Sequence, residues 1–189
     1  MTFRKLAATF LITTGLCLSA PSWAQAAPCD VRDMTSPPAV EWMHEYGWRY
    51  DTPQAAQAGY LRLVDGQSPW PDWFTPAVSL LQPGTLFQMA LSSTQADDRP
   101  GGFGTFDFID DVAEVREDLA VLLAWKSDVQ RVTTYRITRV LPVLVGPIGP
   151  QVDPQACQLL DGRFSQFQML VPAADRMTYL EVVSSRPIQ

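Results

Sequence analysis

The chain has 189 residues, of which 47% are hydrophobic and 18% are charged, a composition that suits one folded domain and argues against intrinsic disorder. Its formal net charge is −6, and removal of residues 1–26 would take away two basic residues and no acidic one, leaving 12 basic against 20 acidic residues and a net charge of −8. A surface of this sign repels phosphate backbones, so we expect no nucleic-acid partner.

The first 26 residues are typical of a secretory signal peptide. Arg4 and Lys5 precede a short apolar run, and a small-x-small cleavage site ends at Ala26. The apolar run is shorter than the roughly 20 residues that span a bilayer, so we expect no stable membrane insertion. The sequence therefore predicts a secreted or periplasmic protein in which residues 27–189 form a single domain.

Two cysteines, Cys29 and Cys157, remain after that cleavage. An even pair in an exported chain is best explained by one disulfide, because the compartment is oxidising. In the chain-entropy model, closing a loop of roughly 130 residues stabilises the fold by about 4 to 5 kcal/mol.

The first part of the predicted domain contains short patterns of different kinds. Residues 48–52 alternate aromatic and charged side chains and stop at a proline, which predicts a short strand. Residues 54–59 suggest one helical turn, broken at Gly59. The proline-rich stretch that follows carries Trp70, Trp73 and Phe74, which either cap the core or line a ligand cleft.

The clearest pattern lies between residues 103 and 145. Residues 104–109 alternate as a half-buried strand does, and residues 110–126 carry apolar side chains at helical spacing behind two aspartates. Residues 131–140 are β-branched, alternate strictly, and lead into an apolar run. Further strands are predicted at residues 86–94, 164–171 and 177–183. We therefore predict a single α+β domain with a mostly antiparallel, split sheet, one principal helix packed on it, and one disulfide.

Few residue types suited to catalysis are present. His44 is the single histidine, and no nucleophile-elbow motif accompanies it, so a structural role is favoured over a catalytic triad. The acidic residues between Asp107 and Asp118 do not follow an EF-hand spacing, and we expect no metal. Lys126 is the single lysine after residue 26, which either a GC-rich genome or the lysine scarcity of cytosol-entering toxins would explain.

The stretch Trp48-Arg49-Tyr50-Asp51-Thr52 resembles the strand that opens the catalytic domain of ADP-ribosyltransferase toxin A chains, such as those of pertussis and cholera toxins. The resemblance spans roughly residues 46–183. It implies that Arg49 and Asp51 help to bind NAD as a substrate. It also implies that Ser92-Ser93-Thr94, with Ser93 and Thr94 as the binding residues, or alternatively Gly104-Thr105, fill the place of the Ser-Thr-Ser strand.

The E-x-E motif of that family is altered, because Gln166 and Gln168 stand at the two glutamate positions. A carboxylate stabilises the positive charge that develops on the ribose, whereas an amide can only hydrogen-bond to it. The resemblance therefore implies either an active transferase with an unidentified glutamate or a relative that binds NAD and has lost the reaction. Its partners would be a host target protein or B-type delivery subunits.

The alternative is a secreted, non-catalytic binding or accessory domain that uses the aromatic loop, residues 70–74, against a protein or glycan partner. The placement of Arg49 distinguishes the two hypotheses. A cleft shared by Arg49 and Gln168 favours the transferase, and an Arg49 salt bridge on a closed surface favours the binding domain.

Overall fold

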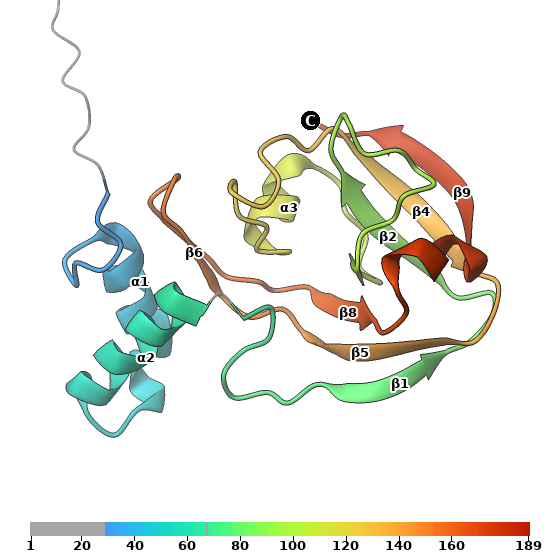
Figure 1. The fold of residues 1–189 in the computed structure, drawn as a ribbon. Helices are drawn as coiled ribbons and strands as arrows, with labels where there is room; N and C mark the ends of the chain where they lie inside the picture. Colours follow the sequence, from blue (N-terminus) through green and yellow to red (C-terminus); the bar gives the residue numbers. More distant parts are fainter. Residues whose placement is uncertain (1–28, 67) are drawn as a thin grey trace, which may run out of the picture.

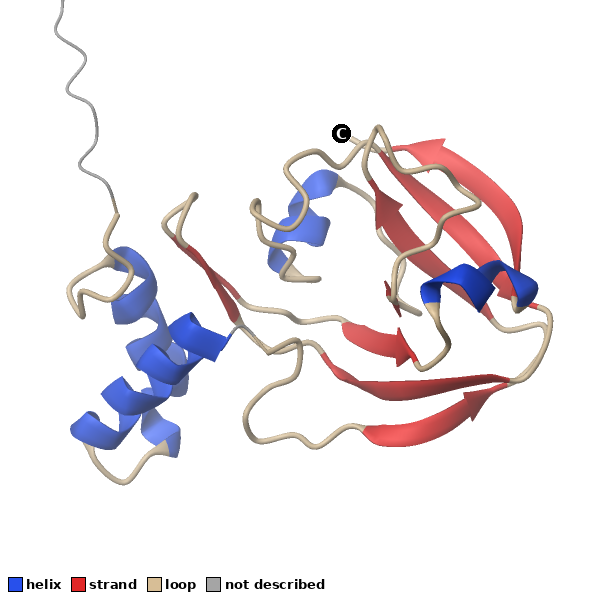
Figure 2. Cartoon of the chain, viewed as in Figure 1, coloured by secondary structure: helices blue, strands red, loops and turns tan. Residues whose placement is uncertain are grey.

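The computed structural model describes residues 29–66 and 68–189 and shows a single α+β domain, as predicted (Figures 1 and 2). The helices are α1 (Pro37–Tyr46), α2 (Pro53–Gly66) and α3 (Val112–Glu117), with 3-10 helices at Gly47–Arg49 and Ala173–Thr178. The strands are β1 (Ala77–Leu81), β2 (Leu86–Leu91), β3 (Phe103–Gly104), β4 (Arg131–Ile137), β5 (Leu141–Pro147), β6 (Gln151–Asp153), β7 (Gln158–Leu160), β8 (Ser165–Met169) and β9 (Leu180–Pro187). No helix in these ranges is long and apolar enough to span a membrane.

Two antiparallel sheets form the body of the molecule. One has four strands in the order β1-β5-β8-β3, and the other has three in the order β2-β4-β9. The chain changes sheets at residues 138–140, so the run predicted from residue 131 to 145 becomes two strands, β4 and β5, that lie in different sheets. Strands β6 and β7 make a separate hairpin.

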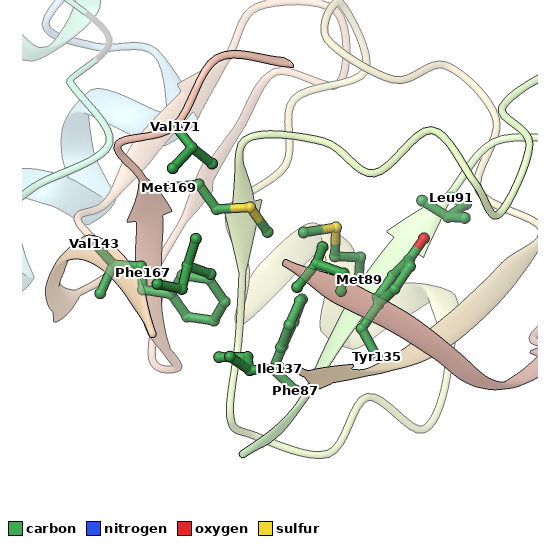
Figure 3. Close-up of a cluster of buried hydrophobic side chains, with 11 residues drawn as sticks. Phe87, Met89, Leu91, Tyr135, Ile137, Val143, Phe167, Met169 and Val171 are labelled. Carbon is green, nitrogen blue, oxygen red and sulfur yellow. The ribbon is translucent and has the colours of Figure 1, made fainter. Parts of the chain in front are cut away.

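The main core fills the space between the two sheets (Figure 3). Phe87 of β2 lies with its ring 5.4 Å from that of Tyr135 and 4.9 Å from that of Phe167, so three strands from the two sheets meet at one aromatic cluster. Gly104 of β3 is enclosed by the Phe87 and Phe167 rings, and a Cβ there would lie 2.7 Å from both. The alternation of apolar residues in these strands is thus explained by one shared interior.

Residues 29–66 form a helical unit at one end of the molecule, with the β6–β7 hairpin between it and the sheets (Figure 1). Its core contains the buried Trp42 and Tyr60 and is completed by Val152 and Leu159 of the hairpin. The predicted disulfide is confirmed: Cys29 and Cys157 are bonded, with their Cα atoms 5.7 Å apart. The bond ties the start of the helical unit to the hairpin.

The strand predicted at residues 48–52 is wrong, because Gly47–Arg49 form a 3-10 helix between α1 and α2. Helix α2 also runs unbroken through Gly59, where the sequence predicted its end. The Tyr50 ring lies so close to Gly59 that a Cβ would come within 2.4 Å of the Tyr50 hydroxyl oxygen. Glycine is needed here for close packing and does not break the helix.

The predicted helix over residues 110–126 is shorter than expected. Asp111 caps α3 by accepting a hydrogen bond from the Glu114 backbone N–H at 2.9 Å, and the helix ends at Glu117. Beyond it Ala120 has a φ of 48°, and the Arg116 guanidinium donates to the carbonyl oxygens of Val121 and Lys126. An arginine side chain thus satisfies carbonyl groups in a compact turn. Val115 does pack against Val132 of β4, as the prediction required.

Candidate functional site

A cavity of about 190 Å³ lies in the seam between the two sheets, beside β2, β3 and β8. It is smaller than the roughly 300–1,000 Å³ typical of sites for drug-sized ligands. Its walls are mostly apolar and contain a few polar side chains; they include Gln88, Met89, Leu91, Gln95, Phe103, Thr105, Leu119, Val121, Lys126 and Gln166. A cavity of this size suits a small molecule or one end of a larger one.

The polar side chains of the cavity carry amides, one hydroxyl and one amine. The Gln88 side-chain oxygen accepts from the Ile109 N–H at 2.9 Å, and the Gln166 amide donates to the Pro69 carbonyl oxygen at 2.5 Å. Lys126 Nζ donates to the Ala90 carbonyl oxygen at 2.6 Å. Among the described residues that line this space, none carries a carboxylate, an imidazole or a thiol. The arrangement offers hydrogen bonds to a ligand but lacks the acid–base pairs of a hydrolase.

The loop of residues 92–102 borders the cavity and is pinned to β4. The Asp97 carboxylate accepts from Thr133 Oγ1 at 2.8 Å and from Arg131 Nε at 3.0 Å. These contacts, the Thr133 hydroxyl foremost, hold the pKa of Asp97 below its usual value. The buried Tyr135 hydroxyl donates to the Asp97 carbonyl oxygen at 2.8 Å, and burial raises the pKa of Tyr135 to about 12. Three side chains of β4, those of Arg131, Thr133 and Tyr135, therefore hold the loop at Asp97.

Structure and prediction can be compared directly at the two glutamines. Gln166 lines the cavity, but Gln168 does not. In the register of the four-stranded sheet, Gln168 lies between Leu144 and Phe103 on the face turned away from the main core. The E-x-E resemblance assigned both glutamines to catalysis; that role is untested for either, and the structure gives them different surroundings.

The hydroxyl candidates are also separated. Ser93 donates from its backbone N–H to Asp128 at 2.9 Å, and both Ser93 and Thr94 are exposed in the pinned loop. The alternative pair, Gly104-Thr105, lines the cavity instead. Thr105 is buried, and its hydroxyl donates to Asp107 at 3.1 Å.

Arg49 is not brought together with Gln168. Its guanidinium carbon lies 3.3 Å from the centroid of the Trp73 ring, and its Nη1 lies 3.9 Å from the Asp72 carboxylate. Asp51 is exposed at the start of α2. Arg49 therefore joins the helical unit to the aromatic loop, which is the arrangement that favours the binding domain.

The aromatic loop lines a groove of about 440 Å³ against α2, here called the aromatic groove. Trp70, Trp73 and Phe74 contribute to it, together with Trp42 and Arg62. Trp73 is 48% exposed, whereas Phe74 packs over Gly146 on the outer side of the four-stranded sheet. The loop thus both covers part of the sheet and leaves an accessible groove, so each of the two sequence interpretations is partly met.

A second accessible surface lies on the outer side of the same sheet. Two rows of residues cross it: Val78, Leu144, Gln168 and Phe103 in one, and Leu80, Pro142 and Leu170 in the other. Val78 is 69% exposed, Leu80 57%, Leu170 45% and Phe103 41%. We call this surface the apolar face. It was not predicted, because the residues that form it come from four strands far apart in the sequence.

The other candidates have structural surroundings. His44 is exposed and its ring nitrogen lies 2.8 Å from the Glu45 carboxylate. In the acidic cluster, Asp111 serves as the cap of α3, and Asp107 accepts from Ser165. Within residues 29–66 and 68–189, no group of three His, Cys, Asp or Glu side chains is placed to hold a metal ion.

No protein-family model and no curated protein matches the chain. Its fold is similar to a solved structure of Tne2 in complex with Tni2, with a TM-score of 0.54, 22% identity, and coverage of 63% of this chain and 97% of that one. Weaker likenesses are to Rhs1-CT in complex with its cognate immunity protein RhsI1 (TM-score 0.44, 19% identity, 61% and 82% coverage) and to Tse6 in complex with Tsi6 (TM-score 0.39, 16% identity, 77% and 93% coverage).

These comparisons and the structure correct the resemblance to ADP-ribosyltransferase toxin A chains. The similar fold with a TM-score of 0.54 comes from a complex of Tne2 with Tni2, and neither of these names indicates an ADP-ribosyltransferase A chain. The five residues that carried the resemblance form a 3-10 helix and a turn in the helical unit, not the first strand of a catalytic sheet. NAD binding itself is tested by none of these observations.

Proposed function

We propose that this chain is an exported domain that binds another protein through the apolar face. The main observation behind this proposal is that four apolar side chains are exposed on one side of one sheet: Val78, Leu80, Phe103 and Leu170. Single exposed apolar residues are common, but a contiguous apolar surface indicates an interaction site. The disulfide supports export, because such bonds persist in oxidising compartments.

The side chains that form the apolar face favour a protein partner over a glycan. Its apolar side chains are aliphatic apart from Phe103, and burying them gains from exclusion of water rather than from hydrogen bonds to hydroxyl groups. Gln168, near its centre, makes no side-chain hydrogen bond to the described residues, so its amide is available to a partner. The solved structure with a similar fold is a complex of two proteins, Tne2 and Tni2, which supports a protein partner here as well.

The experiment is affinity capture of the tagged, exported protein from its own host, followed by a direct binding measurement with each captured protein. Leu80→Glu places a charge within the apolar face, on its β1 side. We expect it to weaken binding by at least thirtyfold, the loss of about 2 kcal/mol that defines a hot spot. Val40→Glu is the matched control, since Val40 is 56% exposed on α1, far along the chain from the face.

The proposal predicts that wild type and Val40→Glu retain the same partner and that Leu80→Glu loses it while its unfolding midpoint is unchanged. Equal binding by all three proteins would overturn the assignment of the face. Loss of the partner with Val40→Glu but not with Leu80→Glu would move the site to the helical unit and its aromatic groove.

A further inference from the structure

Lys126 places an amine in the wall of the cavity between the sheets and is not part of the apolar face. Its Nζ donates to the Ala90 carbonyl oxygen at 2.6 Å and to the Gln95 side-chain oxygen at 3.2 Å. An ammonium has three N–H donors, so these two contacts leave one donor for the cavity. Among the described residues, no carboxylate lies within salt-bridge distance of it.

A second cation reinforces the first. The Arg116 guanidinium donates to the carbonyl oxygens of Lys126 at 2.7 Å and Val121 at 2.9 Å, and it forms no salt bridge with a described residue. It therefore holds the backbone that carries Lys126 and adds positive charge beside it. The nearby carboxylates are already engaged, Asp128 with Ser93 and Asp97 with Arg131.

The electrostatics of Lys126 agree with this geometry. Burial lowers the pKa of its ammonium, Asp128 opposes that effect, and Arg116 and Arg131 add to it. Partial burial of a charge without a carboxylate partner is unfavourable. A ligand that brings a negative charge would relieve that cost.

The remaining walls limit what such a ligand can be. The cavity is about 190 Å³, its sides include Met89, Leu119 and Val121, and Gln88 and Gln166 supply amide groups. None of the described lining residues carries a negative charge that would repel an anion. The space therefore suits a compact molecule with an apolar body and one acidic group.

We propose that the cavity binds a small organic anion, a carboxylate or a phosphate monoester with an apolar body, whose negative charge contacts Lys126 Nζ. This site is separate from the proposed partner surface except at Phe103, which borders both. A negative result for this site would therefore not count against protein binding by the apolar face, and a negative result for the face would not count against this site.

The sequence makes the test unusually specific, because Lys126 is the single lysine of residues 27–189. Biosynthetic incorporation of lysine carrying ¹³C at Cε labels this side chain alone and leaves its three N–H donors in place. We would titrate the labelled protein with benzoate, phenyl phosphate and the neutral analogue benzamide, and follow the Lys126 Cε signal by NMR. The unlabelled protein would be titrated in parallel by calorimetry.

We expect saturable shifts of the Lys126 signal with benzoate or phenyl phosphate, and the stronger of the two identifies the acidic group. In calorimetry, Lys126→Met should weaken that probe at least tenfold, whereas Arg139→Gln, which removes one positive charge outside the cavity, should not. Lys126→Gln serves if the methionine variant does not fold. The proposal is overturned if neither anion shifts the wild-type signal, if benzamide binds as well as the anions, or if the Lys126 and Arg139 variants lose affinity equally.

Discussion

The helical unit, residues 29–66, and the two-sheet body, residues 77–189, are stabilised in different ways. The helical unit packs largely on itself, with Trp42 against Tyr46, Tyr50 and Tyr60, and it is completed from outside by one hairpin and one disulfide. The body has no such clamp. Its core joins strands that lie far apart in the sequence and enclose Phe87, Tyr135 and Phe167 between two sheets.

We infer from this difference that the Cys29–Cys157 disulfide contributes more to the stability of the helical unit, whose packing is local, than to that of the body. The small helical core takes only Val152 and Leu159 from outside residues 29–66, whereas the main core of the body takes residues from strands of both sheets. The body should therefore unfold cooperatively, and the helical unit should depend on its attachment. Four changes test that comparison.

The largest effect is expected from Cys29→Ser combined with Cys157→Ser. For a sequence separation of 128 residues, loss of the disulfide should lower the free energy of unfolding by about 5 kcal/mol in the chain-entropy model. In urea, fluorescence of the buried Trp42 should change at a lower concentration than the circular dichroism of the sheets. Reducing agent added to this variant is the control and should have no further effect. A single transition, coincident in fluorescence and circular dichroism and with the wild-type midpoint, would show that the disulfide does not stabilise the helical unit.

Phe167→Ala should destabilise the body by about 3 to 5 kcal/mol, because Phe167 is fully buried between Phe87 and Phe106. Chemical denaturation would measure this loss. Phe108→Ala is the matched control: its ring is 63% exposed and contacts Arg186, so its loss should cost under about 1 kcal/mol. Similar losses for the two variants would contradict the placement of the core.

Tyr135 should make the body sensitive to alkali. Its folded-state pKa is raised to about 12, above the value of about 10 in the unfolded chain. The stability that follows is fully present below pH 10 and is lost as the pH rises towards 12, a change of roughly 2 to 3 kcal/mol. Tyr135→Phe should remove this alkaline loss, measured as the unfolding midpoint against pH. An unchanged pH profile in that variant would assign the effect to other groups.

The smallest effect is expected from Arg49→Ala. Loss of its stacking on Trp73 and its long contact with Asp72 should cost about 0.5 to 1 kcal/mol. Thermal unfolding would measure this cost, with Arg32→Ala, in an exposed ion pair, as the control. The same variant tests the NAD prediction made from the sequence: binding of NAD by the wild type but not by Arg49→Ala in calorimetry would show that Arg49 contributes to NAD binding.

The sequence predicted the strands of the body better than the helices. The strands predicted at residues 86–94, 131–140 and 164–171 are found, slightly shortened, at 86–91, 131–137 and 165–169, because one side of each faces a shared core. The strand predicted at residues 104–109 is wrong beyond Gly104, since β3 contains only Phe103 and Gly104. The strand expected at residues 177–183 begins later, at Leu180, because residues 173–178 form a 3-10 helix. Strand β1 and the β6–β7 hairpin were missed, since their short, proline-flanked sequences carry little periodicity.

The helices failed for reasons that involve distant contacts. Gly59 was interpreted as a break, although it is required by the Tyr50 ring against α2. The helical spacing of residues 110–126 is real, yet Leu122 packs in a different cluster from Val115, and Arg116 supplies hydrogen bonds that a continuing helix would supply. The cavity and the apolar face depend on strand register across the sheets, which no local pattern encodes.

Strand β1 lies at the edge of its sheet, with Val78 and Leu80 facing outward. An edge strand beside apolar side chains favours pairing with a second edge. Pro76 and Pro83 bracket the strand and lack the backbone donors that a longer ladder would need. A preparation of the isolated chain should therefore lose dissolved protein slowly on concentrated storage, and turbidity, rather than any change in the circular dichroism of the dissolved protein, should be the first sign.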